Sequence, residues 1–151
     1  MTDSLGEKLY EYELNITGIT EYGASLQAVL AGDAPPPPSG LRVDVAFEGT
    51  ATGKISGTVR GVDYLNFRAD GRSELDIKAT ITTADGELIA LAADGVATPQ
   101  PGSPLIRLRE NATLTTASPA YGWVNALQVW GVGTVDLGAG KIVVRGYADI
   151  A

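Results

Sequence analysis

The sequence predicts an all-β protein in which antiparallel strands follow one another as a meander and close into a barrel of about eight or nine strands. Three observations favour this fold class. Apolar and polar residues alternate with a period of two, Asp-Gly pairs separate the alternating segments, and glycines recur inside and beside them. A meander of this length has to protect its edge strands, and closure into a barrel does so. A two-sheet sandwich is the structural alternative.

The alternation is clearest in three segments, residues 8–17, 41–47 and 74–83. In the first segment Tyr, Tyr, Leu and Ile occupy the even positions from 10 to 16, and polar residues occupy the odd positions. Side chains of a strand point alternately to its two faces, so one face of each segment is expected to be buried. The candidate strands are 8–17, 41–48, 53–60, 62–68, 73–83, 87–93, 105–115, 124–136 and 141–149.

Turns between these strands are marked by Asp70-Gly71 and Asp85-Gly86. An Asp-Gly pair supplies the positive φ that a tight hairpin requires. The sequence Leu-Gly-Ala-Gly at 137–140 predicts a third turn. Glycines inside or beside the strands predict bulges or bends where a barrel curves. They are Gly49, Gly53, Gly57, Gly61, Gly131 and Gly133.

Residues 25–31 break the period of two and predict one or two helical turns, with Ser25 as the N-cap and Gly32 at the end. The four prolines at 35–38 impose an extended polyproline II segment. We interpret this segment as a stiff connector into the next strand, and the alternative is a ligand for a proline-recognising domain. Residues 98–104 form a second proline-containing loop.

Composition limits the chemistry that this chain can perform. The 151 residues include no Cys and no His, and their net charge is −7. We expect one domain over residues 1–151. Catalytic triads with His, thiolate nucleophiles, disulfides and the common zinc and iron–sulfur sites are excluded, so no metal and no cofactor is expected.

The excess of acidic residues disfavours nucleic acid and anionic membranes as partners. The polar N-terminus, residues 1–7, has no signal-peptide core, and no apolar stretch approaches the ~20 residues of a membrane span. We therefore expect a cytoplasmic protein.

A series of short motifs begins at Phe47. They are Phe-Glu-Gly at 47–49, Gly-Lys-Ile-Ser-Gly at 53–57, Gly-Val-Asp-Tyr at 61–64, Arg-Ala-Asp-Gly at 68–71, Thr-Ala-Asp-Gly at 83–86 and Tyr-Gly-Trp-Val-Asn at 121–125. In order and spacing this series resembles the bacterial β-barrel family called domain of unknown function 3237, over roughly residues 8 to 149. The resemblance implies a lipocalin-like or allene-oxide-cyclase-like antiparallel barrel that self-associates as a homo-oligomer. It implies no activity.

Three positions depart from the pattern of that family. Tyr64 stands where the family tends to have Trp, Arg60-Gly61 where it has paired glycines, and Thr115 near where many members carry Glu. Any activity of the family that relied on these positions would be weakened in this chain.

Asp63 is the most informative carboxylate. In a strand over 62–67 it shares a face with Leu65 and Phe67, and a carboxylate on an apolar face is paired, hydrogen-bonded or raised in pKa. We interpret Asp63 as a catalytic acid or base, or as an anchor for a ligand, in the barrel interior. The alternative is a structural carboxylate that accepts backbone amides at a bulge. Tyr64, a candidate ligand-binding residue, points to the opposite face unless a bulge intervenes.

Tyr121, Trp123 and Asn125 share one face if the strand over 124–136 begins early. Two aromatic rings and an amide are suitable walls for a small-molecule pocket, so the three are candidate ligand-binding residues. The alternative is an aromatic plug that closes one end of the barrel, with Asn125 capping a turn.

Arg107 and Arg109 share a strand face with Leu105 and are the last candidate ligand-binding residues, because two guanidinium groups on one face can clamp a carboxylate. The alternative is an ordinary solvated face. The other face of the same segment carries Ile106, Leu108 and Glu110.

Three functions remain open from the sequence. The first is a barrel that binds a small apolar or aromatic molecule, which a barrel of about eight strands can hold. The second is a cofactor-free isomerase, cyclase or lyase that uses Asp63 as its acid or base. The third is a homo-oligomeric structural barrel whose lumen is filled with side chains. Whether the lumen is filled distinguishes the third function from the other two.

Overall fold

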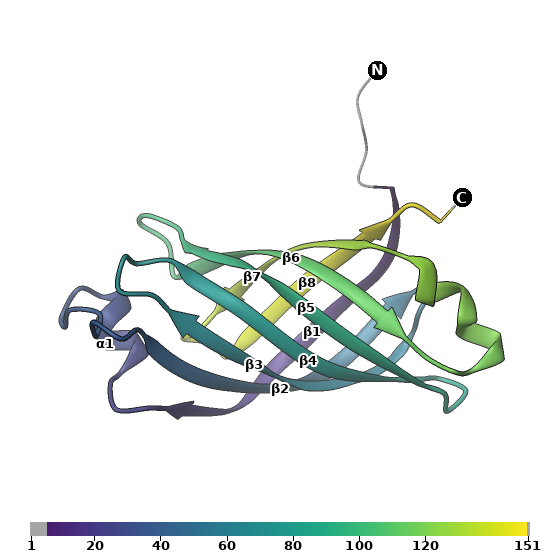
Figure 1. Cartoon of the computed structure of the whole chain (residues 1–151), viewed down its shortest axis with the longest axis horizontal. Helices are drawn as coiled ribbons and strands as arrows, with labels where there is room; N and C mark the ends of the chain where they lie inside the picture. Colours follow the sequence, from purple (N-terminus) through teal and green to yellow (C-terminus); the bar gives the residue numbers. More distant parts are fainter. Residues whose placement is uncertain (1–5, 151) are drawn as a thin grey trace, which may run out of the picture.

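A computed structural model describes residues 6–150 as a closed antiparallel barrel of eight strands. Each strand pairs with the next along the chain, and the last strand pairs with the first (Figure 1). The elements are β1 (Glu7–Glu21), α1 (Leu26–Leu30), β2 (Leu41–Gly53), β3 (Gly57–Phe67), β4 (Ser73–Thr83), β5 (Leu88–Pro99), β6 (Leu105–Thr115), the 3₁₀ helix η1 (Pro119–Ala126), β7 (Val129–Asp136) and β8 (Lys141–Ala148). The predicted barrel is confirmed, and the sandwich alternative is wrong.

Several boundaries differ from the predicted strands. β1 continues to Glu21 past the expected end at 17, β2 to Gly53 past 48, and β5 to Pro99 past 93, so that residues 98 and 99 belong to a strand and not to the predicted loop 98–104. Residues 53–60 and 62–68 were expected as separate strands, but Gly61 sits inside β3 and pairs on both sides, with Phe47 and Ala79. Residues 124–126 were expected to begin a strand but belong to η1, which starts at Pro119. Proline is favoured in the first turn of a helix, where its missing N–H has no intrahelical partner.

The absence of a signal sequence was predicted from residues 1–7. Residues 1–5 of this segment lie outside the described part of the chain. Over residues 6–150, no helix is both long and apolar enough to cross a membrane.

The two ends of the barrel are covered differently (Figure 1). At one end α1 begins at Ser25, whose side chain accepts a hydrogen bond from the backbone N–H of Ala28, and it buries Leu26 and Val29. This agrees with the predicted helix and its cap. At the other end η1 follows β6 and buries Val124 completely. The proline segment 35–38 connects α1 to β2 without regular secondary structure.

The half of the barrel near η1 is filled with large side chains. Leu9, Tyr10, Ile55, Ile81, Ile89, Val124 and Val129 are all fully buried there. Leu9 and Tyr10 are both buried although they are consecutive, because the register of β1 against β8 shifts between Lys8 and Tyr10. A bulge of this kind turns two neighbouring side chains away from strict alternation. The packed half leaves any open space in the lumen to the α1 half.

Candidate functional site

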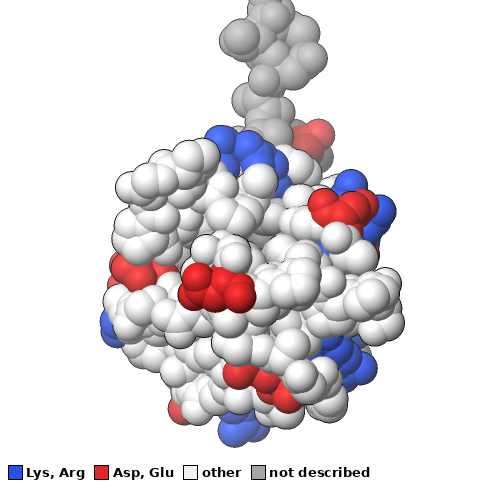
Figure 2. Space-filling view, turned by 90° about the vertical axis from the view of Figure 1, so that its left-hand side faces the viewer, with Lys and Arg blue, Asp and Glu red and all other residues white. Residues whose placement is uncertain are grey.

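The lumen contains a cavity in the half that α1 covers. Its volume is about 70 Å³, and its walls come from all eight strands and from Leu26 and Leu30 of α1. One buried water needs roughly 10–15 Å³ on this measure, so the cavity has room for a small ligand. The lining is apolar apart from four side chains, Tyr12, Asp63, Ser73 and Glu110. Figure 2 shows that the molecular surface at this end is mostly uncharged, with acidic and basic groups scattered over it.

Glu110 is the most deeply buried carboxyl group of the cavity, with only 2% of the residue exposed. It lies on β6, and its register partners are Gly95 on β5 and Gly131 on β7. A Cβ atom at Gly131 would lie 3.3 Å from Glu110 Cβ, so the glycine leaves room for the glutamate side chain. Burial raises the pKa of Glu110 to about 7, and the nearby charge of Asp63 raises it further, against a hydrogen bond from Tyr12 that lowers it.

Tyr12 places a hydroxyl group beside this carboxylate. Its Oη atom donates to Glu110 Oε1 at 3.5 Å, which is at the long limit for a hydrogen bond. The ring of Tyr12 stacks on that of Tyr10, with centroids 5.0 Å apart. The Tyr10 hydroxyl is near enough to Tyr12 to affect its pKa, yet within the described residues it is buried without a hydrogen-bond partner. Burial raises the pKa of both tyrosines, so both hydroxyl groups are neutral.

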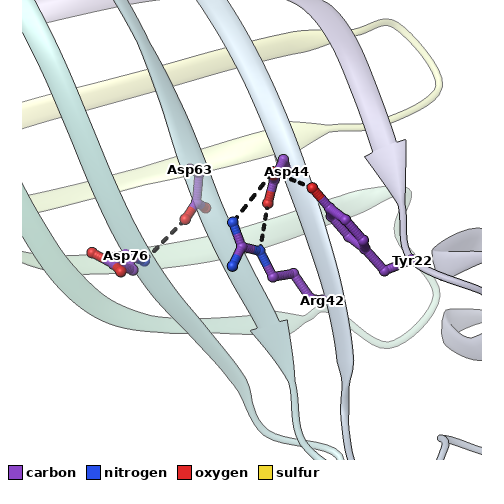
Figure 3. A network of polar contacts seen from close by, with 5 residues as sticks. All are labelled: Tyr22, Arg42, Asp44, Asp63 and Asp76. Carbon is purple, nitrogen blue, oxygen red and sulfur yellow. Dashed lines mark hydrogen bonds and ion pairs between the residues drawn. The ribbon is translucent and has the colours of Figure 1, made fainter.

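Asp63 reaches the cavity from β3 and is partly buried. Its Oδ1 atom accepts the backbone N–H of Asp76 on β4 at 3.0 Å (Figure 3). The pairing of β3 with β4 skips Tyr64 and Leu65 at this point, so the side chain bridges a gap between the strands. Burial raises the pKa of Asp63 to about 6; the Asp76 amide opposes this, and the charges of Asp76 and Asp44 add to it.

The negative charge of the cavity has no positive partner inside it. No lysine or arginine is among the lining residues, and the ion pairs of residues 6–150 use other carboxylates. Asp44 accepts hydrogen bonds from Arg42 and Tyr22, and this network is separate from the contact between Asp63 and Asp76 (Figure 3). Two carboxyl groups and one phenol in an apolar enclosure can therefore anchor a ligand or exchange a proton with it.

Comparison with known proteins assigns the chain to a family. Residues 43–148, from β2 to β8, match the family model described as Protein of unknown function (DUF3237). The chain belongs to this family. No curated protein matches the sequence.

Solved structures with the same fold are similar to this DUF3237 chain over nearly its whole length. A beta-barrel like protein from Acinetobacter baumannii AYE has 20% identity and a TM-score of 0.75, with 94% of this chain and 93% of that one covered. A protein with unknown function from Clostridium acetobutylicum ATCC 824 has 19% identity and a TM-score of 0.76, covering 94% and 96%. A protein described as an enzyme, from Penicillium herquei, has 20% identity and a TM-score of 0.64, covering 93% and 91%.

The positions at which this chain departs from the DUF3237 pattern lie outside the cavity. Tyr64 is on the outer face of β3, where the guanidinium of Arg42 stacks on its ring at 5.2 Å from the centroid. Arg60 and Thr115 are exposed. A ligand held in the cavity is therefore not in contact with any of these three residues.

The other predicted ligand-binding residues also lie outside the cavity. Arg107 is exposed and Arg109 partly so, on the face of β6 opposite to Glu110. Among the described residues neither arginine forms an ion pair, which agrees with the solvated-face alternative.

Tyr121, Trp123 and Asn125 do not share a strand face, because all three belong to η1. The Tyr121 hydroxyl donates to Asp85 in the β4–β5 turn at 2.9 Å. Trp123 is 40% exposed. The side chain of Asn125 bonds both backbone groups of Thr116, at 2.8 Å each. Asn125 thus caps the segment before η1 as the alternative expected, but the plug is not aromatic, because Val124 is the side chain that is buried at this end.

Of the predicted site residues, the structure thus brings only Asp63 to the cavity, and the sequence reasoning missed Glu110 and Tyr12. A signal for Glu110 was present, since it shares a strand face with Ile106 and Leu108 as Asp63 does with Leu65. Over residues 6–150, no three acidic side chains, His or Cys gather in a way that could hold a metal ion.

Proposed function

We propose that this protein binds a small, mostly apolar molecule in the cavity of the α1 half. The observation that carries this proposal is a cavity of about 70 Å³ in the lumen whose lining includes only four polar side chains. Ligand sites of this kind combine apolar walls, which supply affinity, with a few polar groups that orient the ligand. Glu110, Tyr12 and Asp63 are the anchors in this proposal, and Leu26 and Leu30 of α1 contribute to the apolar wall.

A series of neutral alcohols from butan-1-ol to octan-1-ol tests this function. Each added methylene contributes ~0.8 kcal/mol of transfer free energy, so the affinity should rise by a factor of about four per carbon until the cavity is full. Isothermal titration calorimetry measures these affinities, and native mass spectrometry of freshly purified protein reports any molecule that is already retained.

A pair of alanine substitutions on β5 provides the control. Ala97 lines the cavity and Ala90 is exposed on the other face of the same strand. Ala97→Leu adds three carbon atoms inside the cavity and should weaken hexan-1-ol binding at least ~tenfold, because displaced volume is lost to the ligand. Ala90→Leu should leave it unchanged. Equal affinities in the two variants, or no dependence on chain length, would show that the alcohols bind elsewhere or not at all.

A second candidate function, cofactor-free proton transfer, is favoured by the raised pKa of two carboxyl groups in one cavity. With pKa values of about 6 and about 7, Asp63 and Glu110 each have an appreciable population of both forms near neutral pH. Acid–base catalysts work best when their pKa lies near the operating pH. The fold is also that of the Penicillium herquei protein described as an enzyme. In this reading one carboxylate removes a proton next to a carbonyl group, and Tyr12 or the other carboxyl group donates to the oxygen.

Exchange of the α-protons of hexan-2-one in D₂O tests for cofactor-free proton transfer, and this test does not require a known substrate. We expect exchange above the buffer rate, followed by ¹H NMR, and a loss of most of the excess in Asp63→Asn or Glu110→Gln. Asp94→Asn, which changes an exposed carboxylate, is the control. Exchange at the buffer rate in the wild type, or an undiminished rate in both cavity variants, would remove proton transfer from consideration.

The lumen is only half filled, which disfavours a purely structural barrel. The homo-oligomeric state, the cytoplasmic location and the bacterial origin predicted from the sequence stay predictions. The same native mass spectrum that detects a retained molecule reports the number of chains in the particle.

A further inference from the structure

We propose that the preferred ligand of this cavity is a small hydrophobic amine, an apolar chain or ring that carries one protonated nitrogen. This inference rests on the proposed ligand-binding function and names the chemical class of the ligand. It comes from three properties of the site: uncompensated carboxyl groups, an unused acceptor atom and an apolar enclosure.

Uncompensated charge is the first property. Asp63 on β3 and Glu110 on β6 both line the cavity, and Glu110 senses the charge of Asp63. No lysine or arginine lines the cavity, and within residues 6–150 neither carboxylate belongs to an ion pair. Buried carboxylates are ordinarily paired with a cation or neutralised by a proton. A ligand that brings its own positive charge supplies the missing partner.

The unused acceptor is Oε2 of Glu110. The residue is 2% exposed, and in the described structure its carboxyl group receives a single hydrogen bond, from Tyr12 to Oε1. An ionised carboxylate has about four acceptor sites, whereas an ammonium group has three donors and no acceptor. An ammonium group beside Glu110 can donate to this oxygen and retain donors for Asp63 and the Tyr12 oxygen.

The apolar enclosure excludes the other charged ligands. An anion would be repelled by both carboxyl groups. Calcium and magnesium take about six or more oxygen ligands, and the cavity offers few oxygen atoms among leucine, isoleucine and valine side chains. An alkyl or aryl amine places its apolar part against these side chains and its nitrogen at the carboxyl groups.

Binding of an amine should be coupled to proton release. The groups that face the two carboxyl groups are Tyr10 and Tyr12 on β1, Asp44 on β2 and Asp76 on β4, and none of them carries a positive charge. A cation held among them favours the ionised form of both carboxyl groups. At pH 6.5, where Glu110 is largely protonated, binding should therefore release a proton to the buffer.

Hexylamine and hexan-1-ol form a matched pair for the test. They have the same number of heavy atoms, and an alkylamine has a pKa near that of lysine, ~10.4, so it is protonated at neutral pH. Calorimetry with wild-type protein at pH 7.5 should give at least a ~tenfold higher affinity for the amine, since hydrogen bonds between charged groups are the stronger ones. At pH 6.5 the apparent enthalpy of amine binding should vary with the ionisation enthalpy of the buffer.

The ratio of the two affinities is then measured in variants. Glu110→Gln should reduce it to within a few-fold of one, while Glu48→Gln, which removes an exposed carboxylate of β2, should leave it unchanged. Asp63→Asn is a second, independent variant with the same expected direction. If hexan-1-ol binds and hexylamine binds no better, the amine inference is overturned and the proposed function stands. If neither molecule binds, both fail.

Discussion

The Glu110→Gln variant is expected to be more stable than the wild type at pH 8, by about 3 kcal/mol, with a smaller advantage at pH 5. Burial raises the pKa of Glu110 from an ordinary value of 4.5 to about 7. Ionisation of this group therefore opposes folding, and glutamine has the shape of the protonated form without the proton to lose.

The direction follows from proton linkage. Between the unfolded pKa near 4.5 and the folded pKa of about 7, the folded state binds more protons than the unfolded state. Stability contributed by this group is therefore present at low pH and falls as the pH rises through this window. Asp63, with a pKa raised to about 6, acts in the same direction in both proteins. The advantage of the variant should grow by about 2 kcal/mol between pH 5 and pH 8.

Urea denaturation at pH 5, 6, 7 and 8 measures this advantage. The series stops at pH 5 because the isoelectric point lies near 4.4, where solubility is lowest. Glu48→Gln is the control, since the same change at an exposed residue should give a small difference that does not vary with pH. A variant that is less stable than the wild type at pH 8 would mean that the Glu110 carboxylate is stabilised by its surroundings.

The Gly49→Ala variant is expected to lose about 3 kcal/mol of stability or more. Gly49 of β2 pairs with Leu14 of β1, and an added Cβ atom would lie 2.0 Å from the backbone oxygen of Glu13. Rotation of a side chain cannot relieve this contact, because the atom it meets belongs to the main chain. The two strands would have to separate at this pair.

Gly122→Ala is the matched control for this substitution. Gly122 lies in η1, has no positive φ and has no atom within 4 Å of an added Cβ. We expect its free energy of unfolding to stay within about 0.5 kcal/mol of the wild type. Urea denaturation of both variants at one pH is sufficient. Similar stabilities of Gly49→Ala and Gly122→Ala would mean that β1 and β2 adjust more easily than their spacing implies.

Most of the barrel could be predicted from local patterns. Alternation located the buried faces of β1, β2 and β4, and the Asp-Gly pairs located two hairpins, where Gly71 and Gly86 have φ angles of 93° and 89°. The structure of the barrel end that η1 covers could not be predicted in this way. Residues 121–129 alternate as a strand would, and this pattern does not indicate the hydrogen bond by which Tyr121 of η1 contacts Asp85 in the β4–β5 turn.

The candidate site could be predicted only in part. The alternation rule places Asp63 on an inner face, and the same rule places Glu110 there. The candidate residues predicted on β6 were instead Arg107 and Arg109, which lie on the outer face. The cavity depends on how the side chains of eight strands and α1 together fill the lumen, so no local pattern indicates its position. Neither does a pattern indicate the bulge that buries Leu9 next to Tyr10.

Methyl NMR with hexan-1-ol tests the central claim, ligand binding in the α1 half of the lumen, most directly. The isoleucines report on both halves. Ile77, Ile106 and Ile142 line the cavity, whereas Ile55, Ile81 and Ile89 are fully buried in the packed half. We predict that the alcohol shifts the δ1 methyl signals of the first three and leaves those of the second three in place. Saturating alcohol that shifts only the exposed Ile19, or no isoleucine at all, would contradict the claim.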